Sequence, residues 1–315
     1  MRNWTVGLVV AILVFALAYI AIPALSPTDS PQPLNDDDVP PPETQNRIRG
    51  ERTDMRPTAI GEVLVDGVGT FTFNPAEVQT LRPDLFNDGH FSLFDVLVHV
   101  ADRGDLELEY GFDEDLNTHH IESIEGRENW WYDAYYSGGW PEASVFRVDH
   151  YPYKDGTTLS FVPAEEAFLE SVYDTYRKEI TRRGAADGEI VVPEVRIEGR
   201  DRTRVFENVV VRPHDLRDDV FQPGVITAID VILTLAEAGE LSYDLQWYGS
   251  LGTADVVGSY WVNRIDDDVS RGRCGFVYEA GAHEFRFFRG NHNHIPSDIR
   301  IINSPEYVEY FWICI

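Results

Sequence analysis

Acidic and amide side chains occur at a spacing that calcium sites use. Asp113, Asp115 and Asn117 follow one another as D-x-D-x-N. An EF-hand loop also needs glycine at its sixth position and glutamate at its twelfth, where this chain has Thr118 and Ile124. We therefore interpret this segment as an acidic turn.

Two histidine pairs are the other candidates for metal ligands. His292 and His294 would lie on one side of an extended strand, and His119 is followed directly by His120. A zinc site needs three or four ligands and a supporting shell, and the spacing shows no third ligand for either pair. We therefore predict no metal and no other cofactor from the residues themselves.

An aromatic run that begins at Trp130 offers a candidate binding site. Tyr132, Ala134 and Tyr136 are expected to face the core, so the residues between them point away from it. The candidate ligand-binding residues are Trp131, Asp133, Tyr135 and Trp140. Exposed aromatic rings often mark a binding platform. The alternative is that this face packs on the connecting helix or on the other domain, because large aromatic residues are mostly buried.

Catalytic signatures are missing from the sequence. It contains no G-x-S-x-G, H-E-x-x-H, Walker loop or complete G-x-G-x-x-G. Because the chain has 54 aspartates and glutamates, some carboxylates must lie close together, so such a pair does not indicate a glycosidase. An enzyme stays open as an alternative if both domains enclose Asp133, His119 and His120.

Two cysteines, Cys274 and Cys314, lie in strand-like runs. An exported chain permits a disulfide between them, but spacing alone does not show whether their Cα atoms approach within about 7 Å. We favour two buried thiols, with a disulfide as the alternative.

Charge composition limits the partners. The chain has a net charge of −28, and Lys154 and Lys178 are its only lysines. Such a surface fits a protein that stays soluble at high salt. No run of basic residues is present, so we predict no nucleic-acid partner.

The N-terminal segment predicts export. Residues 4–25 carry no charge and are long enough to cross a bilayer core of about 30 Å. Arg2 precedes them and aspartates follow, which places the N-terminus inside and the rest outside the cell. We predict a transmembrane anchor over residues 1–25, and the alternative is a signal peptide cleaved near Ala16-Leu17-Ala18. Residues 26–57, rich in proline and aspartate, are expected to form a disordered stalk.

One unit occurs twice in the rest of the chain. Residues 92–104 match residues 227–239 at a constant offset of 135 positions. Each segment opens with a capping-box pattern, has apolar residues at helical spacing and ends at a glycine, which predicts a helix of about three turns. Hairpins precede both helices, and alternating strands follow them.

The predicted boundaries follow from this repeat. The first domain spans residues 58–162, a connecting helix and linker span 163–189, and the second domain spans 190–315. We also match Arg82-Pro83-Asp84-Leu85 with the segment Arg212-Pro213-His214-Asp215-Leu216, and Tyr136 with Tyr278. Strands that cover one helix in each domain predict an α+β fold.

Three segments resemble a known family. They are Ser123-Ile124-Glu125-Gly126, the aromatic run Trp130–Gly139, and Asp155–Phe161. After a helix that ends in glycine, this order resembles the transcobalamin-like C-terminal domain family, over about residues 60–162 and more faintly 190–315. The resemblance implies two tandem β-grasp-like domains, each a four- to five-stranded sheet covering one helix, and cobalamin as a ligand. The family usually has asparagine before the turn glycine, where this chain has Ser137 and Ala280, and the motif mostly specifies the fold.

The sequence therefore predicts a membrane-anchored, extracytoplasmic binding or interaction protein of the cell envelope. Its partner, a protein or a small molecule, is not identified by the residues. A corrinoid or other flat ligand on Trp131, Tyr135 and Trp140 is one alternative, and an extracytoplasmic enzyme with a site at the domain interface is the other.

Overall fold

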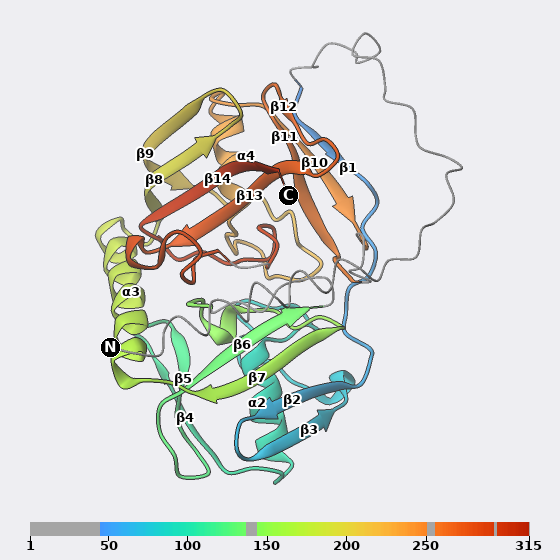
Figure 1. The fold of residues 1–315 in the computed structure, drawn as a ribbon, viewed down its shortest axis with the longest axis vertical. Helices are drawn as coiled ribbons and strands as arrows, with labels where there is room; N and C mark the ends of the chain where they lie inside the picture. Colours follow the sequence, from blue (N-terminus) through green and yellow to red (C-terminus); the bar gives the residue numbers. More distant parts are fainter. Residues whose placement is uncertain (1–44, 137–143, 251–255, 293–294, 315) are drawn as a thin grey trace, which may run out of the picture. The chain divides into compact units, whose positions relative to one another are not determined.

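Two four-stranded sheets of the same topology form the framework of the protein (Figure 1). The computed structural model describes residues 45–136, 144–250, 256–292 and 295–314. Within them, three helices and fourteen strands give an α+β fold. Each sheet belongs to one copy of the repeated unit. In both, the first strand of the N-terminal hairpin pairs in parallel with the last strand of that copy. The last strand also pairs antiparallel with the strand that precedes it in the sequence.

The first copy of the repeated unit contains the sheet with strand order β3-β2-β7-β6. Its strands are β2 (Gly61–Val65), β3 (Gly69–Phe73), β6 (Trp130–Tyr136) and β7 (Thr157–Pro163). Helix α2 (Leu93–Asp102) and the hairpin of β4 (Leu108–Asp113) and β5 (Thr118–Ile124) complete it. Val63, Val65 and Phe161 are fully buried because alternate residues of the strands face the core.

The second copy of the repeated unit contains the sheet with strand order β9-β8-β14-β13. Its strands are β8 (Ile190–Glu198), β9 (Thr203–Val211), β13 (Cys274–Gly281) and β14 (Tyr307–Cys314). Helix α4 (Asp230–Glu237) follows β9 in the chain. A second sheet contains β10 (Tyr243–Tyr248), β11 (Ser259–Ile265) and β12 (Asp268–Val269).

The helix ends behave largely as their sequences predict. The Ser92 side chain accepts a hydrogen bond from the Asp95 N–H, and Asp95 accepts one from the Ser92 N–H, so the predicted capping box is present in α2. In the second copy, Thr227 donates to Asp230 as Ser92 does to Asp95, but the Asp230 N–H donates to the Thr227 carbonyl rather than to its side chain, and the helix begins at Asp230 itself. Residues 227–229 therefore form a turn, which shortens α4 relative to α2.

The connecting helix predicted between the copies is α3 (Glu166–Ala185). Leu169, Val172 and Tyr176 are buried on one face, as the helical spacing predicts. Phe168 also lies 6.4 Å, ring centroid to centroid, from Phe285 of the second copy. The helix therefore contacts both copies (Figure 1).

The copies meet at equivalent residues. Phe86 and Phe221 form an antiparallel bridge, with ring centroids 5.7 Å apart. The Asn87 N–H donates to the Val220 carbonyl, and the Gln222 N–H donates to the Leu85 carbonyl. Each bonded residue is 135 positions from its counterpart, so these hydrogen bonds are related by a local twofold axis.

This contact corrects one match made from the sequence. The counterpart of Arg82 is Arg217, at the same offset of 135, and not Arg212. Proline after arginine suggested the wrong segment. A second correction concerns the aromatic strand: Tyr132 pairs with Phe161 as Tyr278 pairs with Tyr310, so Tyr132 rather than Tyr136 corresponds to Tyr278.

Part of the predicted stalk belongs to the folded unit. Strand β1 (Arg47–Arg49) pairs in parallel with β10, and Arg52 donates to the Leu216 carbonyl at 3.0 Å. Gly50 has φ of 88°, and a Cβ there would lie 2.8 Å from the Trp247 Cβ. The expectation of disorder is therefore wrong for residues 45–57, because backbone pairing and close packing on the second copy order them.

The segments predicted as anchor and as the rest of the stalk lie outside the described residues. Among the residues that the structure does describe, none of the helices is both long enough and apolar enough to span a bilayer.

Cys274 and Cys314 form a disulfide. They lie directly opposite each other in the β13–β14 ladder, with Cα atoms 4.0 Å apart. The interpretation as two buried thiols is therefore wrong, because the strand register brings together residues that are 40 positions apart in sequence.

Candidate functional site

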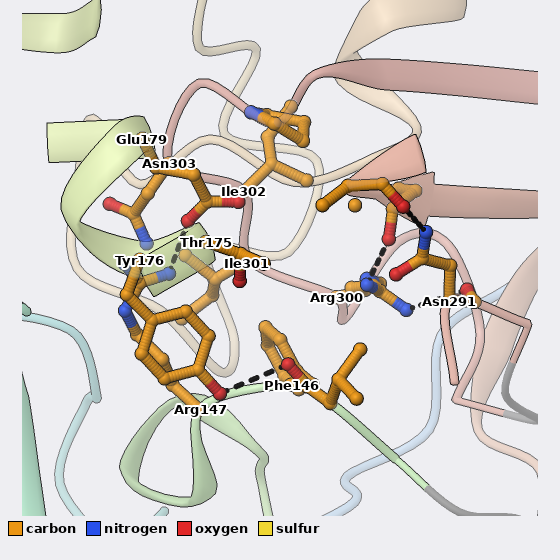
Figure 2. Close-up of a pocket in the computed structure, with 15 residues that line it drawn as sticks. Phe146, Arg147, Thr175, Tyr176, Glu179, Asn291, Arg300, Ile301, Ile302 and Asn303 are labelled. Carbon is orange, nitrogen blue, oxygen red and sulfur yellow. Dashed lines mark hydrogen bonds and ion pairs between the residues drawn. The ribbon is translucent and has the colours of Figure 1, made fainter. Parts of the chain in front are cut away.

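Four cavities in the described part are only large enough for water molecules or similarly small species. Each leaves about 10 to about 20 Å³ for the centres of water molecules, and one water needs about 10–15 Å³ by this measure. One of them lies between the copies, beside Phe146, Glu179 and Arg300 (Figure 2). A flat ligand of corrinoid size does not fit in any of the four.

The cavity beside His119 and His120 is lined by the first copy and α3 alone. Asp133 does not line it, and no second-copy residue does. This cavity is therefore not enclosed by both copies.

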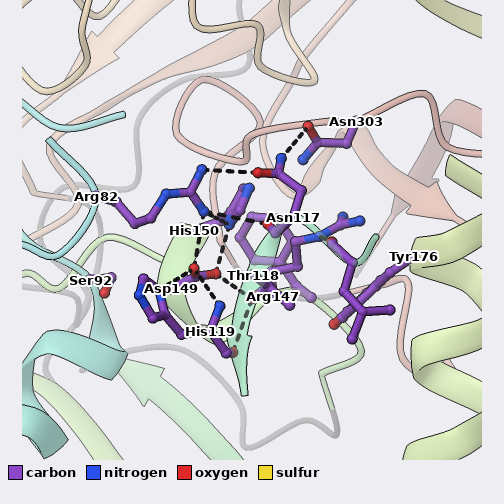
Figure 3. Close-up of polar contacts among 12 residues, drawn as sticks. Arg82, Ser92, Asn117, Thr118, His119, Arg147, Asp149, His150, Tyr176 and Asn303 are labelled. Atoms are coloured by element: carbon purple, nitrogen blue, oxygen red, sulfur yellow. Dashed lines mark hydrogen bonds and ion pairs between the residues drawn. The ribbon is translucent and has the colours of Figure 1, made fainter. Parts of the chain in front are cut away.

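A buried arginine is the centre of polar contacts in the first copy (Figure 3). Arg82 is 3% exposed and donates to both carboxylate oxygens of Asp84, at 2.8 and 2.7 Å. Its Nη1 donates to Asp149 at 3.0 Å, and the guanidinium lies 5.5 Å from the Phe112 ring centroid. Two carboxylates and a ring thus hold this charge in a fixed position.

Asp149 is fully buried and surrounded by hydrogen-bond donors. The His119 N–H, the His119 Nδ1 and the His150 Nδ1 lie within 3.0 Å of its oxygens, and Thr118 also donates. Burial acts to raise the pKa of Asp149, but the two histidines and Arg82 hold it well below its usual range. Burial lowers the pKa of His150 to about 4. Asp149 is therefore a satisfied structural carboxylate rather than an available general base.

The second copy contains the same arrangement around Arg217. Its guanidinium donates to both oxygens of Asp219, at 2.9 and 3.0 Å, and to Asp298 at 2.9 Å. It lies 5.1 Å from the Trp247 ring centroid, and the Tyr260 N–H bonds Asp298 as the His119 N–H bonds Asp149. Because the arrangement occurs at equivalent positions in both copies, we interpret it as a structural feature of the repeated unit.

Trp131, in the aromatic face predicted to bind a ligand, is covered by other parts of the protein. Trp131 is 8% exposed, its Nε1 donates to the Ser144 carbonyl at 2.7 Å, and its ring contacts Phe168 and Tyr173 of α3. Trp131 therefore packs on the connecting helix, which is the alternative that the sequence left open for this face. Asp133 and Tyr135 are half-buried, and burial raises the pKa of Asp133. Trp140 lies outside the described residues.

The weak metal candidates do not come together. Asp113 accepts the Asp115 and Leu116 N–H groups, and Asn117, with φ of 50°, accepts from Arg82. These contacts cap the β4–β5 turn. Within the described ranges, no group of three or more His, Cys, Asp or Glu residues could hold a metal. His292 is buried, and His294 lies outside the described residues.

An exposed aromatic loop was missed by the sequence reasoning. We call residues 286–290 the aromatic loop. Phe287 and Phe288 are 73% and 63% exposed, and both adopt left-handed backbone conformations, with φ of 60° and 62°. The available sequence signal for this loop was the run F-R-F-F-R-G, which begins at the last residue of a 3-10 turn (His283–Phe285) and ends at Gly290. The signal is ambiguous because aromatic residues also favour strands.

A buried carboxylate fixes the aromatic loop. Glu279 is 2% exposed and accepts the N–H groups of Phe287 and Phe288, at 3.2 and 3.0 Å. The Tyr307 hydroxyl donates to the same carboxylate at 2.9 Å. The Phe288 ring lies 4.2 Å from the His292 ring, centroid to centroid. The two phenyl groups are therefore held outward by specific contacts beneath them.

Comparison of the chain with family models, with curated proteins and with solved structures gives no match.

Proposed function

We propose that this chain is a binding protein whose folded part engages a protein partner through the aromatic loop. The observation that carries this proposal is the exposure of two adjacent phenyl rings, 73% for Phe287 and 63% for Phe288. Aromatic residues are enriched at the energetic centres of protein interfaces.

The backbone of the loop supports the same function. A non-glycine residue in the left-handed region costs roughly 1–2 kcal/mol, and such conformations cluster at binding sites where other contacts maintain them. Here Glu279 maintains them by accepting both N–H groups. A loop fixed before binding loses little conformational entropy when the partner arrives.

The charges around the rings indicate the chemistry of the partner. Arg289 is exposed beside Phe288, although the whole chain carries a net charge of −28, whereas Arg286 is already paired with Glu309 at 2.8 Å. A partner with an apolar socket and acidic groups at its rim would complement this loop. An anionic lipid surface is a poorer match because it would repel most of the chain.

The proposal includes the location and the finer fold. We propose that the two copies are diverged β-grasp-like domains of the transcobalamin-like kind, supported by the parallel pairing of first and last strands in both sheets. An N-terminal membrane anchor and an extracytoplasmic position, with a role at the cell envelope, are supported by the uncharged segment 4–25 and by the disulfide.

Sedimentation of solubilised complexes tests the partner. Full-length chain, extracted in mild detergent from cells that express it, should sediment above the size of the 35.8 kDa chain in its detergent micelle. Replacing both phenylalanines, Phe287→Ser with Phe288→Ser, should return it to the size of the free chain. Ile60→Ser is the matched control, because Ile60 is apolar and 66% exposed elsewhere on the surface. A double variant that sediments like the wild type would contradict the proposal.

A further inference from the structure

The cavity between the copies collects buried polar groups from both. The first copy contributes Phe146 and Arg147, α3 contributes Glu179, and the second copy contributes Asn291, Arg300 and Asn303 (Figure 2). The cavity leaves about 20 Å³ for the centres of water molecules, which is the room of one or two waters.

Arg300 brings an uncompensated charge to this cavity. It is 4% exposed, and its guanidinium lies 5.1 Å from the Phe146 ring centroid. It donates to the carbonyls of Asn291 and Ala280. Among the described residues no carboxylate pairs with it, although buried charges in proteins are normally paired.

Other buried arginines differ from Arg300. Arg82, Arg147 and Arg217 each pair with a carboxylate. Arg264 is also buried and has no carboxylate within the described ranges. However, four oxygens accept its N–H groups, whereas Arg300 has two. The Arg300 guanidinium therefore has N–H groups left that can donate to a further acceptor.

Two further donors at the cavity have no acceptor. The Nη2 of Arg147 and the Nδ2 of Asn303 are buried and make no hydrogen bond within the described part of the chain. Asn291 leaves its Oδ1 unpaired there too. Arg147 is itself neutralised by Glu179. Two guanidinium groups and one carboxylate therefore line the cavity, which leaves one positive charge.

We propose that this cavity binds one monatomic anion, chloride, between Arg300, Arg147 and Asn303. A single anion balances the net positive charge and accepts the unpaired N–H groups, and it fits in a space of about two waters. Because Arg147 belongs to the first copy and Arg300 to the second, the ion joins the two copies. The folded protein then requires chloride specifically, in addition to any general effect of salt on its acidic surface.

Anomalous diffraction from crystals of the full-length chain grown in bromide locates the ion. A bromide peak in the cavity, within hydrogen-bonding distance of Arg300 and Arg147, is the expected result. Water density at the site, with bromide absent there, would overturn the proposal. This experiment does not depend on the folding of any variant.

Denaturation at constant ionic strength tests the consequence. Chloride replaces glutamate stepwise in the potassium salt, and each tenfold rise in chloride well above half-saturation should raise the folded-to-unfolded ratio about tenfold in the wild type. Arg300→Met should abolish this dependence. Arg264→Met, the control for loss of a buried arginine, should retain it even if it is less stable. Equal chloride dependence in Arg300→Met and the wild type would overturn the proposal.

Discussion

In the first copy, the carboxylate that faces the buried arginine is bonded to two histidines, whereas its counterpart in the second copy is not. Asp149 has His119 and His150 around it. Asp298 accepts from Arg217 and from the Tyr260 N–H, and within the described part its Oδ1 has no partner. The duplicated unit thus keeps the arginine and changes how strongly its partner carboxylate is stabilised.

The copies also differ at the strand that precedes the last strand of each copy, which is β6 in the first copy and β13 in the second. Asp133 and Glu279 occupy equivalent positions, because both lie one residue after the equivalent tyrosines Tyr132 and Tyr278. In the first copy this face is covered by α3 through Trp131. In the second copy Glu279 instead holds the exposed aromatic loop. The shared contacts maintain the fold, and the function is to be sought where the copies diverge.

Replacing the two buried arginines, Arg82 and Arg217, should give the largest effects on stability. Arg217→Met and Arg82→Met each leave a buried carboxylate without its cation, which typically costs about 3–5 kcal/mol. We expect Arg217→Met to lower the free energy of unfolding more, because Asp298 keeps the Tyr260 N–H and the nearby charge of Lys154, while Asp149 keeps hydrogen bonds from Thr118, His119 and His150. Urea denaturation of the full-length chain measures both.

An exposed pair provides the control for these two variants. Arg103 pairs with Asp105 on the surface, and Arg103→Met should change stability by less than about 1 kcal/mol. Equal effects of Arg82→Met and Arg217→Met would show that the histidines around Asp149 do not compensate.

The disulfide occurs only in the second copy. Closing a segment of 40 residues in the unfolded chain stabilises the folded state by about 4 kcal/mol in the chain-entropy model. Cys274→Ser with Cys314→Ser should therefore expose β13 and β14 to faster hydrogen exchange, while β6 and β7 stay protected. Uniform loss of protection in both sheets would contradict independent stability of the first copy.

Acid should destabilise the first copy more than the second. Burial lowers the pKa of His90 and of His150 to about 4, from 6.5 in the unfolded chain. Between these values the unfolded state binds more protons, so stability falls as the pH falls from about 6.5 to about 4, by about 3 kcal/mol per histidine. The second copy has Val225 and Ile299 at the equivalent positions.

The variant His90→Val places the residue of the second copy into the first. It should reduce the slope of unfolding free energy against pH by about half over that window, whatever its effect at neutral pH. Chemical denaturation at several pH values measures the slope. An unchanged slope would mean that His90 does not titrate as its burial requires.

The smallest expected effect is a gain in stability rather than a loss. Phe287→Gly should stabilise the fold by about 1 kcal/mol, because glycine adopts φ near 60° without a steric penalty. The same variant should weaken partner binding. A loss of stability on this change would show that the Phe287 ring contributes packing, and the argument from backbone strain would be wrong.

Local patterns predicted the elements, and tertiary contacts decided the site. Helical spacing and the glycines at positions 104 and 239 predicted α2 and α4, whose ends those glycines follow with φ of 79° and 77°. Burial of Trp131 depends on α3, which is far from it in sequence. The sequence did not predict the burial of Arg82 and Arg217 either, because a charged residue in a turn normally faces water.

Site-specific photo-crosslinking in cells tests the central claim, that the aromatic loop contacts a protein partner. Benzoylphenylalanine would replace Phe287 in one variant and Ile60 in another, since both side chains are exposed. We predict one discrete protein adduct from position 287 and none from position 60. No adduct from position 287, or the same adduct from both positions, would contradict the claim.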